Sequence, residues 1–195
     1  MLRQATRGAL PNAAAMERYL CVFCGASLGK DESYAAVARE AAKAIVRAGY
    51  GLVYGGARIG LMGVLADAVL AAGGDVIGVI PRALAHSEIA HSGITRLHVV
   101  DSMHERKALM AQSSNAFVAL PGGYGTMDEF CEILTWRQLG IHDKPIGLLN
   151  PDGFYDPLLR LFDEMAAKGF VSRASRALFV TAPGIDELLA MLAPA

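Results

Sequence analysis

The stretch that decides the fold is AFVALPGGYGTMDE, residues 116–129. Its apolar run, Ala116–Leu120, predicts a buried strand, and a turn with proline and three glycines follows at Pro121–Gly125. The next residues open an amphipathic pattern that predicts a helix over Met127–Leu139. This order is typical of phosphate sites in α/β proteins, because glycine lets backbone N–H groups approach an anion closely.

The same alternation of short apolar runs and longer amphipathic runs continues in both directions along the chain. It predicts a doubly wound, Rossmann-like parallel α/β sheet with helices on both faces and a ligand site at the carboxyl ends of the strands. The other predicted strands are Tyr19–Cys24, Gly51–Tyr54, Val76–Ile80, Arg96–Val100, Ile146–Leu149 and Ala177–Val180. The other predicted helices are Ser33–Ala48, Leu61–Ala72, Ser102–Ser113, Phe154–Lys168 and Ile185–Leu192.

The length of 195 residues is that of a single domain. We expect residues 17–195 to form one nucleotide-binding catalytic domain and residues 1–16 to be a flexible leader, with a targeting segment as the alternative. The most apolar stretch, Leu61–Pro81, is interrupted by Asp67, Asp75 and the pair Gly73-Gly74, so it does not predict a membrane span.

The composition narrows the class of partner and the compartment. Apolar residues make up 53% and charged residues 19%, which is enough for a sizeable core. The net charge of −1 argues against a polybasic nucleic-acid binder. An odd count of three cysteines does not make a disulfide framework, so we expect a cytoplasmic protein.

Glycine turns follow two further strands. Gly25 and Ser27 come after the first strand, and Gly55 and Gly56 come after the second, so we expect these residues to line the same edge of the sheet. A Walker-type loop is excluded, because no lysine followed by serine or threonine closes the glycine segments. The dinucleotide pattern G-x-G-x-x-G does not follow the first strand either. A mononucleotide therefore fits the predicted crevice best.

Glu129 has two interpretations. Thr126 can cap the helix, and Glu129 three positions later would then complete a capping box with the Thr126 N–H. Alternatively, the carboxylate lies beside a phosphate held by the free N–H groups of the glycine turn, where it can act on the attached sugar.

Arg106 and Lys107 also have two interpretations. They begin a predicted helix after the fourth strand, with Asp101 or Ser102 as a cap. They are either part of a solvated charged turn, or they face the glycine turn and bind phosphate, for which arginine offers a bidentate fork.

Redox and metal chemistry are not favoured. Cys21 and Cys24 have a C-x-x-C spacing, but within a strand their side chains point to opposite faces. The five histidines show no ligand pattern such as H-E-x-x-H.

The residues PGGYGTMDE (121–129), with MHERK (103–107) upstream, closely resemble the signature of the Lonely Guy family. Members are cytokinin riboside 5′-monophosphate phosphoribohydrolases, long mislabelled as lysine decarboxylases. The resemblance extends to CGAS (24–27), YGG (54–56), GLMG (60–63), Trp136 and QLGIHDKP (138–145), and covers the chain from Tyr19 to about Val171.

The resemblance implies hydrolysis of the N-glycosidic bond of an adenine-type nucleoside 5′-monophosphate, either AMP or a prenylated adenine nucleotide. The products are a free base and ribose 5-phosphate, and neither a metal nor an organic cofactor is implied. The rival hypothesis is a non-catalytic nucleotide-binding or carrier protein on the same fold. Only the enzyme needs Glu129 at the start of its helix, where a carboxylate can stabilise an oxocarbenium-like sugar.

The resemblance also implies the site residues. The catalytic pair falls on Arg106 and Glu129. Ala26 and Ala57 depart from the residues common in the family, which affects base preference more than chemistry. Substrate contacts are implied for Glu88, Arg106, Lys107, Gly122, Gly123, Tyr124, Gly125, Thr126, Met127, Asp128, Glu129 and Thr135.

A homodimer or an assembly of dimers is implied as well. The predicted helix Met127–Leu139 carries Phe130, Ile133, Leu134 and Trp136, which point in more directions than one buried stripe needs. We therefore expect part of this helix to contact a second copy and to complete the active site; the alternative is a helix buried entirely within one chain.

Overall fold

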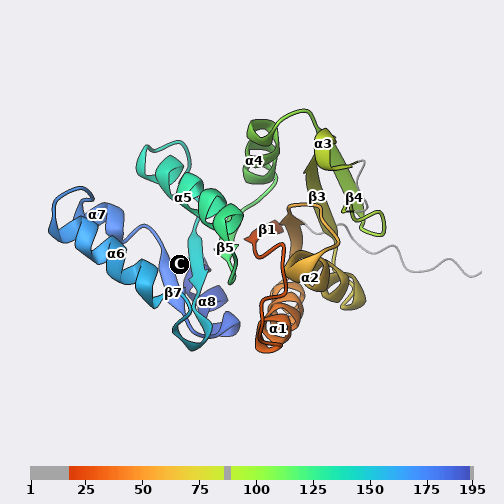
Figure 1. The fold of residues 1–195 in the computed structure, drawn as a ribbon, viewed down its shortest axis with the longest axis horizontal. Helices are drawn as coiled ribbons and strands as arrows, with labels where there is room; N and C mark the ends of the chain where they lie inside the picture. The colour runs from red at the N-terminus through yellow and green to blue at the C-terminus, as the bar shows by residue number, and fades with distance from the viewer. Residues whose placement is uncertain (1–17, 86–88, 194–195) are drawn as a thin grey trace, which may run out of the picture.

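A computed structural model describes residues 18–85 and 89–193 (Figure 1). The strands are β1 Arg18–Phe23, β2 Tyr50–Tyr54, β3 Val76–Pro81, β4 Arg96–Val100, β5 Ala116–Ala119, β6 Ile146–Leu149 and β7 Val180–Ala182. The helices are α1 Ser33–Arg47, α2 Gly60–Ala71, α3 Arg82–Ala85, α4 Met103–Gln112, α5 Tyr124–Gln138, α6 Asp156–Ala167, α7 Arg173–Arg176 and α8 Ile185–Leu192, with a 3₁₀ turn, η1, at Pro151–Gly153.

The seven described strands form one parallel sheet in the order β4-β3-β2-β1-β5-β6-β7, which confirms the predicted fold class. Leu20 in the central strand lies beside Leu52 on one side and Ala116 on the other. The chain builds the sheet outward from β1 to β4 and then returns to the opposite side of β1 with β5. The carboxyl ends of β1 and β5 therefore flank the topological switch point, where doubly wound sheets bind ligands.

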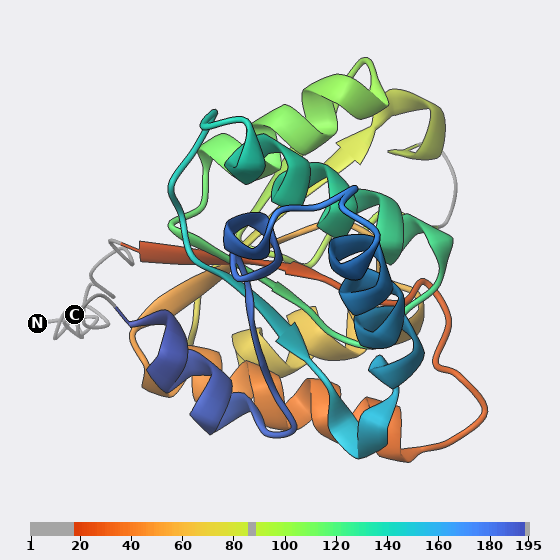
Figure 2. The ribbon, with the colours of Figure 1, turned by 90° about the vertical axis from the view of Figure 1, so that its left-hand side faces the viewer.

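Two apolar layers enclose the sheet, with helices on both faces (Figure 2). One core cluster joins β-strand residues to α1, α2 and α8, and the other joins them to α4, α5 and α6. Neighbouring strand residues alternate between the two clusters, as Leu20 and Cys21 do, because successive side chains point to opposite faces. Burial on both faces explains why these strands are almost continuously apolar.

The predicted last strand, Ala177–Val180, is wrong in position. The strand is Val180–Ala182, and the residues before it complete the turn of α7, where the Leu178 N–H donates to Ser175 O. Phe179 is buried and packs edge-on against Phe130 at a ring separation of 5.4 Å. Only Val180 of the predicted segment pairs with β6, and Phe179 is apolar because it belongs to an aromatic cluster under α5.

The other predicted elements differ from the structure by a few residues at their ends, and α3 and α7 were not predicted. The predicted leader, residues 1–16, lies outside the described residues. Within residues 18–85 and 89–193, no helix is long and apolar enough to cross a membrane.

Candidate active site

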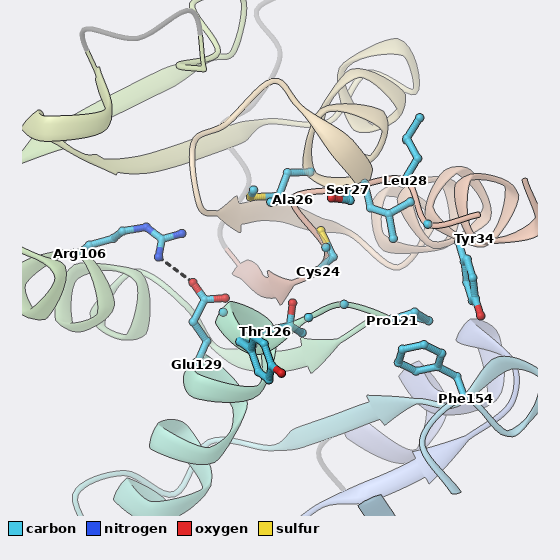
Figure 3. Close-up of a pocket in the computed structure, with 18 residues that line it drawn as sticks. Cys24, Ala26, Ser27, Leu28, Tyr34, Arg106, Pro121, Thr126, Glu129 and Phe154 are labelled. Carbon is cyan, nitrogen blue, oxygen red and sulfur yellow. Dashed lines mark hydrogen bonds and ion pairs between the residues drawn. The ribbon is translucent and has the colours of Figure 1, made fainter. Parts of the chain in front are cut away.

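A pocket of about 450 Å³ opens at the switch point between β1 and β5 (Figure 3). Its walls come from the turns after these two strands and from the first turns of α1, α2 and α5. Nine of the residues predicted for the site line it: Gly25, Ser27, Arg106, Gly122, Gly123, Tyr124, Gly125, Thr126 and Glu129.

The helix that follows the glycine turn begins earlier than predicted. Gly123 is the N-cap of α5, so the helix starts at Tyr124, and Thr126 lies within its first turn. The capping box is therefore wrong: Glu129 lies beyond the first turn, and its carboxylate contacts Arg106 instead of the Thr126 N–H. Since Gly123 has no side chain to cap the helix, the first N–H groups of α5 face the pocket with the positive end of the helix dipole.

Two glycine turns touch at the floor of the pocket. The Gly25 N–H donates to Pro121 O at 3.1 Å, and a Cβ added to Gly25 would lie 3.5 Å from the Gly122 Cα. A Cβ at residue 122 would overlap the buried Thr126 hydroxyl. A Cβ at residue 122 would also lie 2.9 Å from the Gly25 nitrogen, so a side chain there would separate the turns after β1 and β5. A Cβ at residue 25 would lie 2.9 Å from Ser27 O and would disturb its own turn, so this edge needs bare backbone.

Arg106 and Glu129 form a buried ion pair at one end of the pocket. Arg106 Nη1 donates to Glu129 Oε1 at 2.7 Å, and both side chains are about one-tenth exposed. Arg106 comes from the first turn of α4 and Glu129 from the second turn of α5, so the pair joins helices that follow β4 and β5. The expected cap of α4 is confirmed, because Ser102 Oγ accepts from the Glu105 N–H at 3.1 Å.

The guanidinium of Arg106 is held in place by the backbone around it. Its Nε donates to Val79 O at 3.0 Å, near the end of β3. Its Nη2 lies against the Cα of Gly55, where a Cβ would overlap it. The turn after β2 therefore does not line the pocket itself, but its glycine leaves the space that the arginine occupies.

The pKa of Glu129 is raised above its ordinary value of 4.5, chiefly because burial penalises the carboxylate. The neighbouring Arg106 opposes this rise in pKa, as Lys107 does more weakly, and Asp128 adds to it. A carboxyl group whose pKa is shifted in a pocket is a candidate for acid or base chemistry.

Several predicted contact residues lie outside the pocket lining. Lys107 Nζ contacts Asp128 Oδ2 at 3.2 Å and Glu132 Oε1 at 3.0 Å, so it bridges α4 and α5 one residue away from the Arg106–Glu129 pair. Thr135 is exposed further along α5, and its hydroxyl donates to Cys131 O. Met127 and Gly56 also lie outside the lining, and Glu88 lies outside the described residues.

The sequence reasoning missed five apolar lining residues, and those among them that lie away from the Arg106–Glu129 pair give the pocket a second, uncharged end. The five are Leu28, Tyr34, Leu61, Met62 and Phe154. Each comes from a loop or a helix start after a strand, so position alone could have indicated them. Their residue types carried no signal, because apolar side chains at such positions usually belong to the core.

Cys21 and Cys24 belong to opposite core clusters, as predicted, and burial raises the pKa of both thiols. Such thiols are protonated and unreactive. Among the described residues, no group of three or more histidine, cysteine, aspartate or glutamate side chains is arranged to hold a metal ion.

The fold and the pocket are those of an α/β protein with a nucleotide site. The sheet is parallel, bare glycine turns lie at its switch point, and an uncapped helix start and a buried Arg–Glu pair face the pocket. Residues 62–192 match the family model described as "Possible lysine decarboxylase". The chain is 52% identical over 170 residues to the probable cytokinin riboside 5′-monophosphate phosphoribohydrolase LOGL1 of Oryza sativa subsp. japonica, which covers 87% of this chain and 76% of the relative. It is 50% identical over 173 residues to the cytokinin riboside 5′-monophosphate phosphoribohydrolase LOG5 of Arabidopsis thaliana, covering 89% and 76%. The chain therefore belongs to this family, the Lonely Guy family.

Solved structures with the same fold include two molybdenum cofactor proteins. The molybdenum cofactor binding protein of Rippkaea orientalis has a TM-score of 0.68 at 21% identity, covering 91% of this chain and 96% of that chain. The molybdenum cofactor carrier protein of Chlamydomonas reinhardtii has a TM-score of 0.64 at 23% identity, covering 90% and 96%. At these identities the likeness shows the fold alone.

Proposed function

We propose that this chain hydrolyses the N-glycosidic bond of adenine-type nucleoside 5′-monophosphates and releases the free base and ribose 5-phosphate. The relatives' names support the reaction. The observation that carries the proposal is the buried Arg106–Glu129 pair, which opens onto the pocket beside the uncapped start of α5.

The 5′-phosphate binds at the turn from Gly122 to Thr126, where the first N–H groups of α5 and the helix dipole favour an anion. The ribose then extends toward Glu129. Binding energy from the phosphate thereby positions C1′ of the ribose, the atom that reacts, which is remote from the phosphate.

Glu129 acts on the sugar. As the bond from C1′ to N9 breaks, its electron pair leaves with the base and positive charge develops on the ribose. The Glu129 carboxylate stabilises that charge and accepts a proton from the water that attacks C1′, while the departing base gains a proton. Arg106 holds the carboxylate in place, and its remaining donors can bind the ribose or the attacking water.

The rival is a carrier that binds the nucleotide without cleaving it. A carrier gains nothing from burying Glu129 with a raised pKa beside the sugar, since a buried ion pair contributes little net stability. Assays of free base and ribose 5-phosphate with AMP, isopentenyladenosine monophosphate and adenosine decide between the two. We expect both monophosphates to be cleaved and adenosine to be a much poorer substrate; nucleotide binding with no release of base from any of them would favour the carrier.

We further propose a homodimer that forms at the C-terminal end of α5 and the loop after it. The four side chains on which this contact was predicted all pack in the core cluster beneath the helix, so their directions do not support it: Phe130, Ile133, Leu134 and Trp136. Ile141 is 63% exposed and lines a hollow of about 570 Å³ between α4 and α5, and Leu139, two residues before it, is 67% exposed. Trp136 and Phe117 line that hollow. Gln112, His142 and Lys144 also line it, so it joins apolar and polar groups on one surface, as a two-fold interface between identical copies does. Since α5 begins at the pocket, contact with a second copy there would also fix Glu129.

The composition supports a cellular location and a class of partner. Three unpaired cysteines support a cytoplasmic location, and the net charge of −1 supports a small-molecule partner in preference to nucleic acid. Residues 17–195 act in this proposal as one catalytic domain.

A further inference from the structure

The pocket continues past the phosphate turn on the side away from Glu129. Figure 3 shows Arg106 and Glu129 at one side, Thr126 and Pro121 in the middle, and Tyr34 with Phe154 at the far side. The charged pair and the aromatic pair therefore lie at opposite ends of one cavity, with the phosphate turn between them.

The aromatic end is rigidly built. The Tyr34 ring packs over Gly29, where a Cβ would overlap it, and meets Phe154 edge-on at a centroid separation of 5.7 Å. Phe154 in turn meets Tyr155 at 4.7 Å. The Tyr155 hydroxyl donates to Leu120 O at 2.7 Å, which ties the aromatic chain to the residue before Pro121. These rings are thus anchored to the same turn that faces the phosphate.

The aromatic end is also incompletely covered. Leu28 is 50% exposed and Phe154 is 38% exposed, although both line a concave pocket. Apolar side chains left open in such a cavity mark a ligand surface more often than an ordinary part of the protein surface. No arginine or lysine of the described residues lines this end, so it suits an uncharged group and not a further phosphate.

A nucleoside monophosphate does not fill this end. With the phosphate at the turn and the bond from C1′ to N9 beside Glu129, the base points away from Tyr34 and Phe154. A group reaches the aromatic end only if it is attached to the phosphate itself, through one of the oxygens that does not carry the ribose.

We propose that Leu28, Tyr34 and Phe154 form a second subsite that binds a planar, uncharged group carried on the 5′-phosphate. The ligand class is a nucleotide phosphodiester whose second group is an uncharged ring that lies against the Tyr34–Phe154 pair. The orientation of this ligand rests on the proposed function, because Glu129 sets the position of the ribose.

The test compares two diesters of AMP, the phenyl ester and the methyl ester. Both carry one negative charge on the phosphate, so they differ only in the ring. Their dissociation constants are measured by calorimetry in the Glu129→Gln background, so that no ligand is consumed. We expect the phenyl ester to bind about ten-fold more tightly, since ring contacts and apolar burial both favour it.

Two variants test whether the preference for the phenyl ester comes from the Tyr34–Phe154 pair. Phe154→Ala should bring the ratio of the two constants close to one. Phe170→Ala, which removes an 84% exposed ring outside the pocket, should leave the ratio at the parental value. Tyr34→Leu provides a second substitution within the subsite should Phe154→Ala fail to fold, as judged by its thermal melt.

The proposal is overturned if the two esters bind equally to the parent, or if the preference for phenyl survives in folded Phe154→Ala and Tyr34→Leu proteins. It is also overturned if Phe154→Ala selectively weakens binding of isopentenyladenosine monophosphate relative to AMP, because the rings would then hold the prenyl group on the base. Failure of the enzyme to release base from AMP would contradict the proposed function alone, since the ester ratio is a binding measurement.

Discussion

Gly55 and Arg106 fit each other: the guanidinium Nη2 of Arg106 occupies the space that a side chain at residue 55 would need. Gly55 comes from the turn after β2 and Arg106 from the start of α4, so the fit joins two distant parts of the chain. The same guanidinium is held by Val79 O and by Glu129. It has therefore little freedom to move without losing one of these partners.

Gly55→Ala tests this fit. The added methyl group would displace the guanidinium and with it Glu129, and we expect turnover to fall by about 10²-fold, the effect of misplacing a catalytic group by about 1 Å. Gly184→Ala is the matched control, because a Cβ there meets nothing within 4 Å. Steady-state kinetics on AMP and thermal melts of both variants give the measurement. Parental turnover in folded Gly55→Ala would show that the close fit between Gly55 and Arg106 is not needed for catalysis.

The pH dependence of turnover tests the role of Glu129. The reaction needs its carboxylate form, so kcat should fall as the pH drops through the Glu129 pKa. Because burial raises that pKa, the midpoint of the acid limb should lie above 4.5. A profile of kcat from acid to neutral pH provides the check. A limb centred at or below 4.5 would contradict the assignment.

Lys107→Met separates two roles for this lysine. In the structure Lys107 bridges Asp128 and Glu132, and its charge lowers the pKa of Glu129. Its removal should therefore move the acid limb of the kcat profile to higher pH and leave KM for AMP unchanged. A raised KM with an unmoved limb would instead indicate a direct phosphate contact. Lys168→Met, which removes an exposed pair with Glu164, is the control.

Replacing Leu139 and Ile141 together by aspartate tests the dimer. Two charges beside the hollow between α4 and α5 should prevent association, because an apolar interface core does not tolerate unpaired carboxylates. Light scattering over a dilution series should show a dimer for the parent and a species near 20.6 kDa for the variant. Leu161→Asp, at a 50% exposed position on α6, should remain dimeric. A fully active parent near 20.6 kDa would refute the proposal.

Much of the fold was predictable because parallel strands that are buried on both faces consist almost entirely of apolar residues, as in Ala116–Leu120. Of the nine predicted residues that line the pocket, Gly25 and Gly122 were predictable because the close approach of the backbone there is a local requirement for glycine. One local pattern gave a wrong prediction: the spacing of Thr126 and Glu129 is that of a capping box, but the N-cap position of α5 is Gly123, which has no side chain to cap the helix.

The rest depends on contacts between distant segments. Gly55 was expected to line the pocket, but it makes room for Arg106, and no local pattern indicates such a fit. The aromatic end, with Tyr34 from α1 and Phe154 from the loop after β6, exists only once both are placed against the sheet. From the sequence alone, an apolar side chain that lines a ligand pocket looks the same as one that packs in the core.

The central claim is that Glu129 does chemistry on a bound nucleoside monophosphate, and Glu129→Gln tests it most directly. Free base and ribose 5-phosphate released from AMP and from isopentenyladenosine monophosphate are measured for the parent and the variant, together with nucleotide binding. The amide can still accept the Arg106 hydrogen bond but cannot stabilise a cationic sugar or accept a proton. We predict retained binding and a fall in turnover of about 10²–10³-fold. Turnover of the variant near the parental level would contradict the account.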